Sequence, residues 1–139
     1  MRGPLAELAE SLGIGRSVIF AGSRPWDTIG KYYRLGNVFA TASTSETQGL
    51  TYIEAMAAKV PVVVRRDPSF EALIKDGETG YIFEDEQQAA DILHYALTHD
   101  TKATTERGYA AIQTLSARRY AENVARVYQG LAPKNLITV

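Results

Sequence analysis

Two glutamates, Glu46 and Glu54, stand with seven residues between them in the segment "ASTSETQGLTYIEAMAAKVPVVVRR" that starts at Ala42. Carboxylates are strong acceptors for the hydroxyl groups of a sugar, so a pair that faces one pocket can bind a polyol. The same spacing recurs at Glu78 and Glu86, within "ETGYIFEDE". Spacing alone therefore does not define a site, and the elements around each pair must decide.

The hydrophobic pattern around these residues alternates between short apolar runs and helical stripes. We expect four buried strands, at residues 17–22, 37–43, 61–66 and 80–83. We expect helices before, between and after them, at residues 4–13, 25–36, 49–59, 69–77, 86–98, 102–115 and 116–131. In the helix at 49–59 the predicted buried stripe is Ile53, Met56, Ala57 and Val60.

Apolar strands separated by single helices predict an α/β fold with a Rossmann-like parallel sheet and helices on both faces. Four strands are fewer than the six of the usual dinucleotide-type sheet, so the pattern indicates an incomplete domain.

The composition fits one globular unit: 139 residues, 45% of them hydrophobic, with a net charge of -1. The balanced charge argues against a nucleic-acid partner. The absence of cysteine excludes disulfides and thiolate metal sites, and no apolar run approaches the roughly 20 residues that span a bilayer. The start, "MRGPLAELAE", does not resemble a signal peptide. We therefore expect a soluble, cytoplasmic protein.

Ligands of open parallel sheets bind at the carboxyl ends of the strands, where loops lead into helices. Here the loops "GSRPW", "TSETQG" and "RRDPS" follow the first three predicted strands. The helix after the second loop begins near Gly49, so the amides of Gly49, Leu50 and Thr51 would face an anion such as a diphosphate. Glu46 precedes that helix end and Glu54 follows it, where both suit sugar hydroxyls better than phosphates.

Simpler interpretations stay open for each of these side chains. A glutamate near the first helical turn also stabilises the helix through its dipole, and one in the second turn is often only solvated. Arg65 and Arg66 end the third predicted strand, where a phosphate contact and an ordinary exposed arginine pair are both compatible with the sequence.

Several other chemistries lack support in the sequence. His94 and His99 have no carboxylate or cysteine partners at metal-ligand spacing. Ser43, Thr44 and Ser45 have no histidine nearby in the sequence for a catalytic triad. Neither the G-x-G-x-x-G motif nor a G-K-S/T phosphate loop occurs. We expect three aromatic side chains to belong to the core rather than to a stacking platform: Trp26, Tyr32 and Tyr33.

The run "VIFAGSRPWDTIGKYYRLGNVFATASTSETQGLTYIEAMAAKVPVV" resembles the C-terminal, donor-binding half of retaining GT-B glycosyltransferases of family GT4. These enzymes share a glutamate-x7-glutamate motif on the same strand–loop–helix. The wording "TSETQGLTYIEA", followed by "PVVVRRD", is most similar to bacterial 1,2-diacylglycerol 3-glucosyltransferases (monoglucosyldiacylglycerol synthases), which use UDP-glucose. The resemblance is strong over residues 18–84.

By position, the resemblance implies that Glu46 binds hydroxyls of the donor sugar and Glu54 binds the ribose hydroxyls of UDP. It implies contacts to the sugar or the diphosphate at the residues after Glu46: Thr47, Gln48, Gly49, Leu50 and Thr51. It implies a loop near the uracil at Gly22, Ser23 and Arg24. It implies no metal and no cofactor, because protein groups and the helix end hold the diphosphate.

The chain also departs from the family. An arginine and a lysine that neutralise the diphosphate, about two strands and the acceptor-binding N-terminal domain are missing. Many relatives carry a glycine pair where this chain has Arg65, Arg66 and Asp67. We therefore expect residues 1–115 to form a donor-binding domain truncated at its N-terminal side. Residues 116–139 would form a helix and tail like the segment that packs across both domains in the family.

The resemblance implies a parent enzyme that moves glucose from UDP-glucose to a lipid acceptor such as diacylglycerol, with acceptor contacts in the missing domain. Such an enzyme would work at the inner face of the plasma membrane, and the 139 residues alone would be inactive. Two alternatives remain. One is a nucleotide-sugar binding module without chemistry, and the other is a structural fragment that self-associates through an exposed sheet edge.

Overall fold

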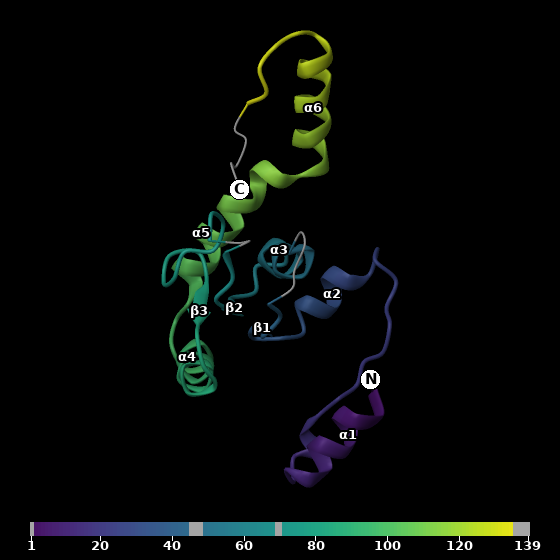
Figure 1. The fold of residues 1–139 in the computed structure, drawn as a ribbon, viewed down its shortest axis with the longest axis vertical. Coiled ribbons are helices and arrows are strands. Elements are labelled where there is room, and N and C mark those ends of the chain that lie inside the picture. The colour runs from purple at the N-terminus through teal and green to yellow at the C-terminus, as the bar shows by residue number, and fades with distance from the viewer. Residues whose placement is uncertain (1, 45–48, 69–70, 135–139) are drawn as a thin grey trace.

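The computed structural model of the chain describes residues 2–44, 49–68 and 71–134. Its strands are β1 (Phe39–Thr41), β2 (Val62–Arg65) and β3 (Tyr81–Phe83). Its helices are α1 (Arg2–Ser11), η1 (Gly15–Ser17), α2 (Ile29–Tyr33), α3 (Leu50–Ala57), α4 (Glu86–Thr98), α5 (Lys102–Ala111), η3 (Ile112–Leu115) and α6 (Ala117–Tyr128). Figure 1 shows the sheet and α3 at the centre, with α1 and α6 at opposite ends.

The three described strands form one parallel sheet in the order β1-β2-β3. Phe39 of β1 pairs with Val62 of β2, and Val63 of β2 pairs with Tyr81 of β3. All three valines of the central strand β2 are buried, as expected for a strand covered on both faces. The predicted α/β fold with a parallel sheet is confirmed.

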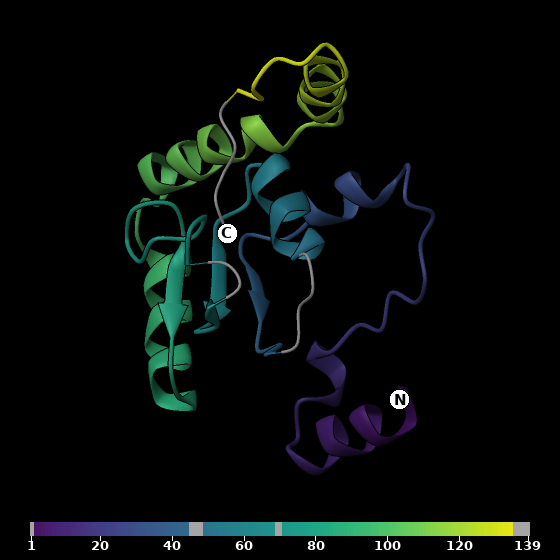
Figure 2. The same cartoon turned by 45° about the horizontal axis from the view of Figure 1, so that its top comes forward.

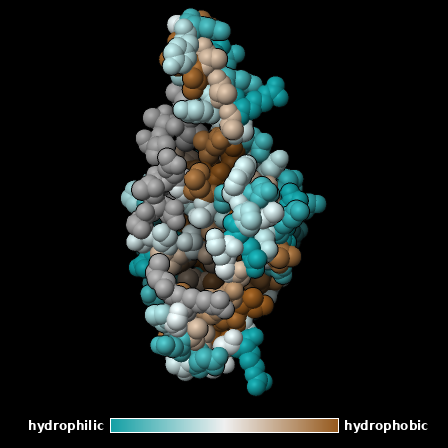
Figure 3. All heavy atoms as spheres, turned by 90° about the vertical axis from the view of Figure 1, so that its right-hand side faces the viewer, coloured by the Kyte–Doolittle hydropathy of each residue, from teal (hydrophilic) through white to brown (hydrophobic). Residues whose placement is uncertain are grey.

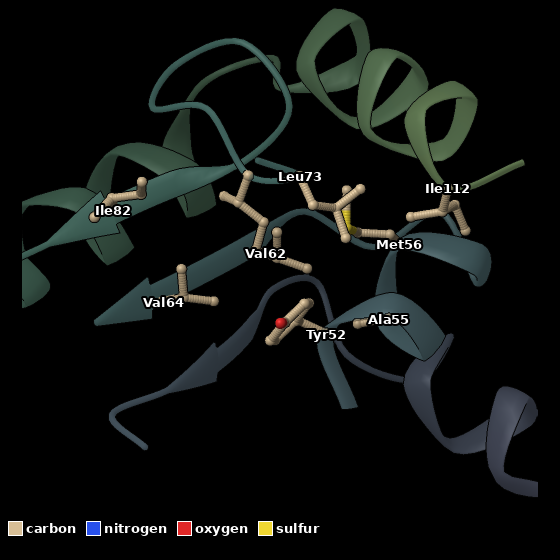
Figure 4. Close-up of a cluster of buried hydrophobic side chains, with 9 residues drawn as sticks. Tyr52, Ala55, Met56, Val62, Val64, Leu73, Ile82 and Ile112 are labelled. Atoms are coloured by element: carbon tan, nitrogen blue, oxygen red, sulfur yellow. The ribbon is translucent and has the colours of Figure 1, made fainter. Parts of the chain in front are cut away.

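Side chains of β2 alternate between two apolar clusters, one on each face of the sheet. One face carries a cluster of residues from the strands, α3, η3 and the segment before β3: Tyr52, Ala55, Met56, Val62, Val64, Leu73, Ile74, Ile82 and Ile112. Figure 4 shows this cluster between α3 and β2. On the opposite face, Val63, Tyr81 and Phe83 pack against Ala96 of α4. Helices therefore cover both faces, as predicted (Figure 2).

The buried face of α3 differs in part from the predicted stripe. Met56 and Val60 are buried, but Ala57 is exposed, and Tyr52 and Ala55 complete the buried face instead. The helix ends at Ala57, and Lys59 turns the chain with a φ of 59°. Val60 is therefore buried from the connection to β2 and not from the helix, so the predicted helix was too long.

The strand predicted at residues 17–22 is wrong. This segment leaves η1 without joining any described strand, and the side chain of Ile19 is 89% exposed. Figures 1 and 2 show it running between α1 and α2, away from the sheet. A β-rich sequence becomes a strand only where another backbone pairs with it, and the described strands offer this segment no partner.

The helix predicted at residues 69–77 is also absent from its described part, which forms turns. Thr79 accepts a hydrogen bond from the amide of Lys75 at 2.8 Å, and the carboxylate of Asp76 accepts one from the amide of Ile82 at 2.9 Å. The amide of Gly77 donates to the carbonyl of Gly80 at 2.9 Å. These short polar side chains satisfy the backbone locally, which competes with helix formation.

The aromatic residues at the start of the predicted helix 25–36 are less buried than expected. Only the α2 part is helical, and Trp26 lies in the preceding turn with 87% of its side chain exposed. The prediction that Trp26 belongs to the core is wrong. The Thr28 amide donates to the Pro25 carbonyl, and this turn holds Trp26 ahead of the helix whose face packs against the core. Tyr33 packs against the core cluster as a half-buried side chain.

Gly108 marks the closest approach of α5 to the segment before β3, and it provides a first stability prediction. A Cβ at this position would lie 2.5 Å from the Thr79 carbonyl oxygen and 3.2 Å from Cε of Met56. We expect Gly108→Ala to lower the free energy of unfolding by about 1–3 kcal/mol, because overpacking outweighs the better helix propensity of alanine. Urea denaturation followed by circular dichroism measures this change.

The matched control is Gly30→Ala in α2, where a Cβ would meet no atom within 4 Å. There only helix propensity changes, so we expect a small gain, up to about 1 kcal/mol. Equal effects at the two glycines would contradict the close contact between α5 and Thr79.

Candidate functional site

The three described strands run parallel, so their carboxyl ends lie along one edge of the sheet, and α3 is the next described helix after β1 (Figure 2). Gly49 is the N-cap residue of α3, with a φ of 60° and a ψ of 30°. Glycine has no side chain that could accept a hydrogen bond from the first amides of the helix, such as those of Leu50 and Thr51. The positive end of the helix dipole lies at the same point. The arrangement suits an anion.

Gly49 is also packed tightly against the third residue of its own helix. Tyr52 is 3% exposed, and a Cβ built on Gly49 would overlap its ring and hydroxyl group. Figure 4 shows that Tyr52 belongs to the cluster between α3 and the sheet. Both the left-handed backbone and the lack of space require glycine here. Since Tyr52 belongs to the core, the first turn of α3 is packed against the core at Gly49.

Glu54 lies about one turn further along α3 and faces α2. Its side chain is half-buried, and its Oε2 accepts a hydrogen bond from the hydroxyl of Tyr33 at 3.0 Å. Tyr33 in turn stands edge-on to the ring of Phe39 in β1, with 5.6 Å between the ring centroids. The sequence predicts Tyr33 only as a core residue, since no local pattern shows that two residues 21 positions apart share a hydrogen bond.

Three predicted site residues, Glu46, Thr47 and Gln48, lie outside the described residues. Of the predicted site, the structure therefore describes the helix start at Gly49, where a diphosphate is expected, and Glu54, which is expected to bind a ribose. The predicted roles in binding the donor sugar stay predictions.

The loop predicted to lie near a uracil lies beyond α2 as seen from α3, and its contact with a base stays a prediction. Gly22, Ser23 and Arg24 are exposed, and α2 lies between this loop and α3 in both ribbon views (Figures 1 and 2). The guanidinium carbon of Arg24 lies 5.1 Å from the ring centroid of Tyr32. The structure thus groups Arg24 with α2 and not with the helix N-terminus.

The two arginines after β2 have different surroundings. Nε of Arg66 lies 2.8 Å from a carboxylate oxygen of Glu84, and its Nη1 lies 3.5 Å from one of Glu71. The hydrogen bond with Glu84 is the largest cause of the raised pKa of Arg66. Arg65 instead lines a hollow of about 390 Å³ at the carboxyl ends of the strands, beside Thr41. This hollow lies against α4, on the face of the sheet opposite to α3, so the structure does not bring Arg65 to the N-terminus of α3.

Within the described ranges, no three histidine, aspartate or glutamate side chains gather closely enough to hold a metal ion. The imidazole of His99 stacks on the ring of Tyr95, with 4.3 Å between the centroids. None of the helices described for this chain is long and apolar enough to cross a membrane.

Residues 2–114 match the family model described as "Glycosyl transferases group 1". The chain belongs to this family. The match includes the three described strands and the helix that starts after Gly49, so the candidate site lies within the part that the family shares.

The chain is also similar in sequence to named glycosyltransferases and in fold to solved ones. The chain is 37% identical over 110 residues to an alpha-monoglucosyldiacylglycerol synthase of Acholeplasma laidlawii. The aligned region covers 77% of this chain and 27% of that protein. The C-terminal domain of a group 1 glycosyl transferase (LpcC) from Francisella tularensis is 28% identical, with a TM-score of 0.71, over 81% of this chain and 60% of that one.

The fold is also that of Anabaena Alr3699/HepE, solved in complex with UDP and glucose, at a TM-score of 0.81 and 23% identity. That match covers 93% of this chain and 36% of the neighbour. The Rossmann-like arrangement is thus that of part of a GT-B glycosyltransferase, as the sequence predicted. The chain spans about a quarter of the curated relative's length, at 27%.

Proposed function

We propose that the chain is the donor-binding part of a retaining glycosyltransferase that moves glucose from UDP-glucose to a lipid acceptor such as diacylglycerol. The observation that carries this proposal is the glycine-led N-terminus of α3, whose first amides no described side chain caps, with Glu54 held by Tyr33 further along the same helix. The group 1 family, the relative named for monoglucosyldiacylglycerol synthesis, and the neighbour solved with UDP and glucose support it.

In the proposed complex, the diphosphate of the donor lies against the first amides of α3, and Glu54 accepts hydrogen bonds from the ribose hydroxyls. Glu46, which the structure does not describe, would orient hydroxyls of the donor sugar. The bond between the anomeric carbon and the diphosphate breaks, a bond to the acceptor oxygen forms on the same face, and the proton of the acceptor hydroxyl passes to the departing diphosphate. Amides aimed at the departing diphosphate stabilise its charge without reorganising. The proposed chemistry needs no metal and no cofactor.

The proposal includes two partners of this chain: an acceptor-binding domain and a membrane surface. On the face drawn in Figure 3, hydrophobic side chains gather in patches among hydrophilic ones. Some large apolar side chains are almost fully exposed, including Trp26 at 87% and Tyr128 at 88%. Such exposure fits a chain that packs against an acceptor-binding domain, which would in turn contact lipid at the cytoplasmic membrane face.

The alternative is a fragment without chemistry that self-associates. The outer edge of β1 favours it, since β1 pairs only with β2 among the described strands. An unpaired edge offers backbone donors and acceptors to another chain. Sedimentation of the 139-residue chain decides between the two: concentration-dependent oligomers that do not bind UDP would support the alternative.

The direct test of the proposed function is calorimetric titration of the chain with UDP. We expect saturable binding that is tighter for UDP than for UMP, because the second phosphate reaches the amides of α3. We expect the isolated chain to transfer no glucose from UDP-glucose to diacylglycerol in vesicles. A folded chain that does not bind UDP would contradict the proposed donor site.

A further inference from the structure

The hydrogen bond between Tyr33 and Glu54 joins two helices at the proposed donor site. Tyr33 is the last residue of α2, and Glu54 lies in the middle of α3. The Tyr33 hydroxyl donates to the carboxylate oxygen Oε2 of Glu54 at 3.0 Å. A glutamate on a helix otherwise samples several rotamers, and fixing one of them costs entropy. The hydrogen bond from Tyr33 offsets this loss of entropy by holding the Glu54 side chain in one rotamer before a ligand binds.

Tyr33 is itself held in place by the core. Its ring packs against the cluster that contains Tyr52 and Met56, and it meets Phe39 edge-on with an interplanar angle of 63°. A tyrosine has only two side-chain torsions, so a packed ring leaves its hydroxyl little freedom. The position of the hydroxyl is therefore set by α2, β1 and α3 together.

Resting on the proposed function, we propose that Tyr33 is a positioning residue, which holds the Glu54 carboxylate in the orientation that receives the two hydroxyls of a nucleotide ribose. A carboxylate has about four acceptor positions, so one bond from Tyr33 leaves capacity for a vicinal diol. Tyr33 does not touch the ligand on this view. It acts through Glu54, and its effect is confined to recognition of the sugar ring of the nucleotide.

A purely structural role makes a different prediction. If the bond only joined α2 to α3, its loss would lower stability without changing which nucleotide is preferred. Selectivity between UDP and 2′-deoxy-UDP separates the two roles, because the latter lacks one ribose hydroxyl and keeps the diphosphate and the base.

The experiment compares Tyr33→Phe with the unaltered chain by calorimetric titration with UDP and with 2′-deoxy-UDP. We expect about a fivefold loss of UDP affinity, typical for removing a hydrogen bond that orients a charged group, and a much smaller loss for 2′-deoxy-UDP. Tyr95→Phe in α4, whose ring packs on Tyr81 and His99, is the matched control and should bind both nucleotides as the unaltered chain does. Thermal unfolding of each variant reports whether the fold is kept.

A double-mutant cycle provides the second measurement. In a Glu54→Ala background there is no carboxylate for Tyr33 to hold, so adding Tyr33→Phe should cause no further loss of UDP affinity. Equal losses for the two nucleotides in Tyr33→Phe, or additive losses in the cycle, would overturn the positioning role while the proposed function stands. Failure of the unaltered chain to bind UDP would overturn the proposed function and this inference with it.

Discussion

Gly49→Ala is expected to lower the free energy of unfolding by about 2–5 kcal/mol. Two costs add at this residue: alanine pays about 1–2 kcal/mol for the left-handed backbone, and overpacking of a filled site costs about 1–3 kcal/mol more. The backbone cost follows from the φ of 60°, and the packing cost follows from the overlap of a Cβ with the buried ring of Tyr52. Urea denaturation monitored by circular dichroism measures the loss.

Gly77→Ala separates the two costs. Gly77 has a φ of 70°, but a Cβ there would meet nothing within 4 Å, so this variant pays only the backbone strain of about 1–2 kcal/mol. A loss at Gly49 no larger than the loss at Gly77 would show that Tyr52 does not fill the space over the helix N-terminus.

The helix-cap and strand patterns show what local sequence determines well. α4 spans residues 86–98 as predicted, and the Asp85 carboxylate caps it by accepting from the amide of Gln88 at 2.8 Å. The strands β2 and β3 lie within their predicted ranges, since a continuous apolar run suits a strand buried on both faces. Caps and apolar runs act over a few residues, so the sequence displays them directly.

The wrong elements depend on distant or competing contacts. The segment at 17–22 has the apolar composition of a strand, but pairing requires a neighbouring backbone, which composition does not reveal. The segment before β3 has a helical pattern, but the side chains of Asp76 and Thr79 bond to nearby backbone groups and favour turns.

The candidate site divides in the same way. Gly49 was predictable, because a glycine between a strand and a helix is a local signal for a helix start that a ligand can approach. The link from Tyr33 to Glu54 was not, because it depends on how α2 packs against α3. Arg66 was a candidate phosphate ligand by position, but only the structure shows Glu84 and Glu71 beside it.

Glu54→Ala is expected to weaken UDP binding by about 10- to 100-fold. Hydrogen bonds to a charged group contribute about 1.5–3 kcal/mol, and each 1.4 kcal/mol corresponds to a factor of ten in affinity. The substitution removes the acceptor for the ribose hydroxyls and leaves the Tyr33 hydroxyl without the carboxylate that it bonds to now. Calorimetric titration with UDP measures the loss, and the affinity for inorganic pyrophosphate should stay unchanged because the amides of α3 remain.

Glu54→Gln tests whether the charge or only the acceptor matters. The amide oxygen of glutamine can still accept from Tyr33, so this variant should keep its fold and lose about tenfold in UDP affinity. The control is Glu106→Gln on α5, an exposed carboxylate that lies 2.9 Å from Nζ of Lys59 and should leave UDP binding unchanged. If Glu54→Gln and Glu106→Gln bound UDP equally well, the charge of Glu54 would have no part in donor recognition. The ribose would then have to be bound elsewhere on the carboxyl edge of the sheet.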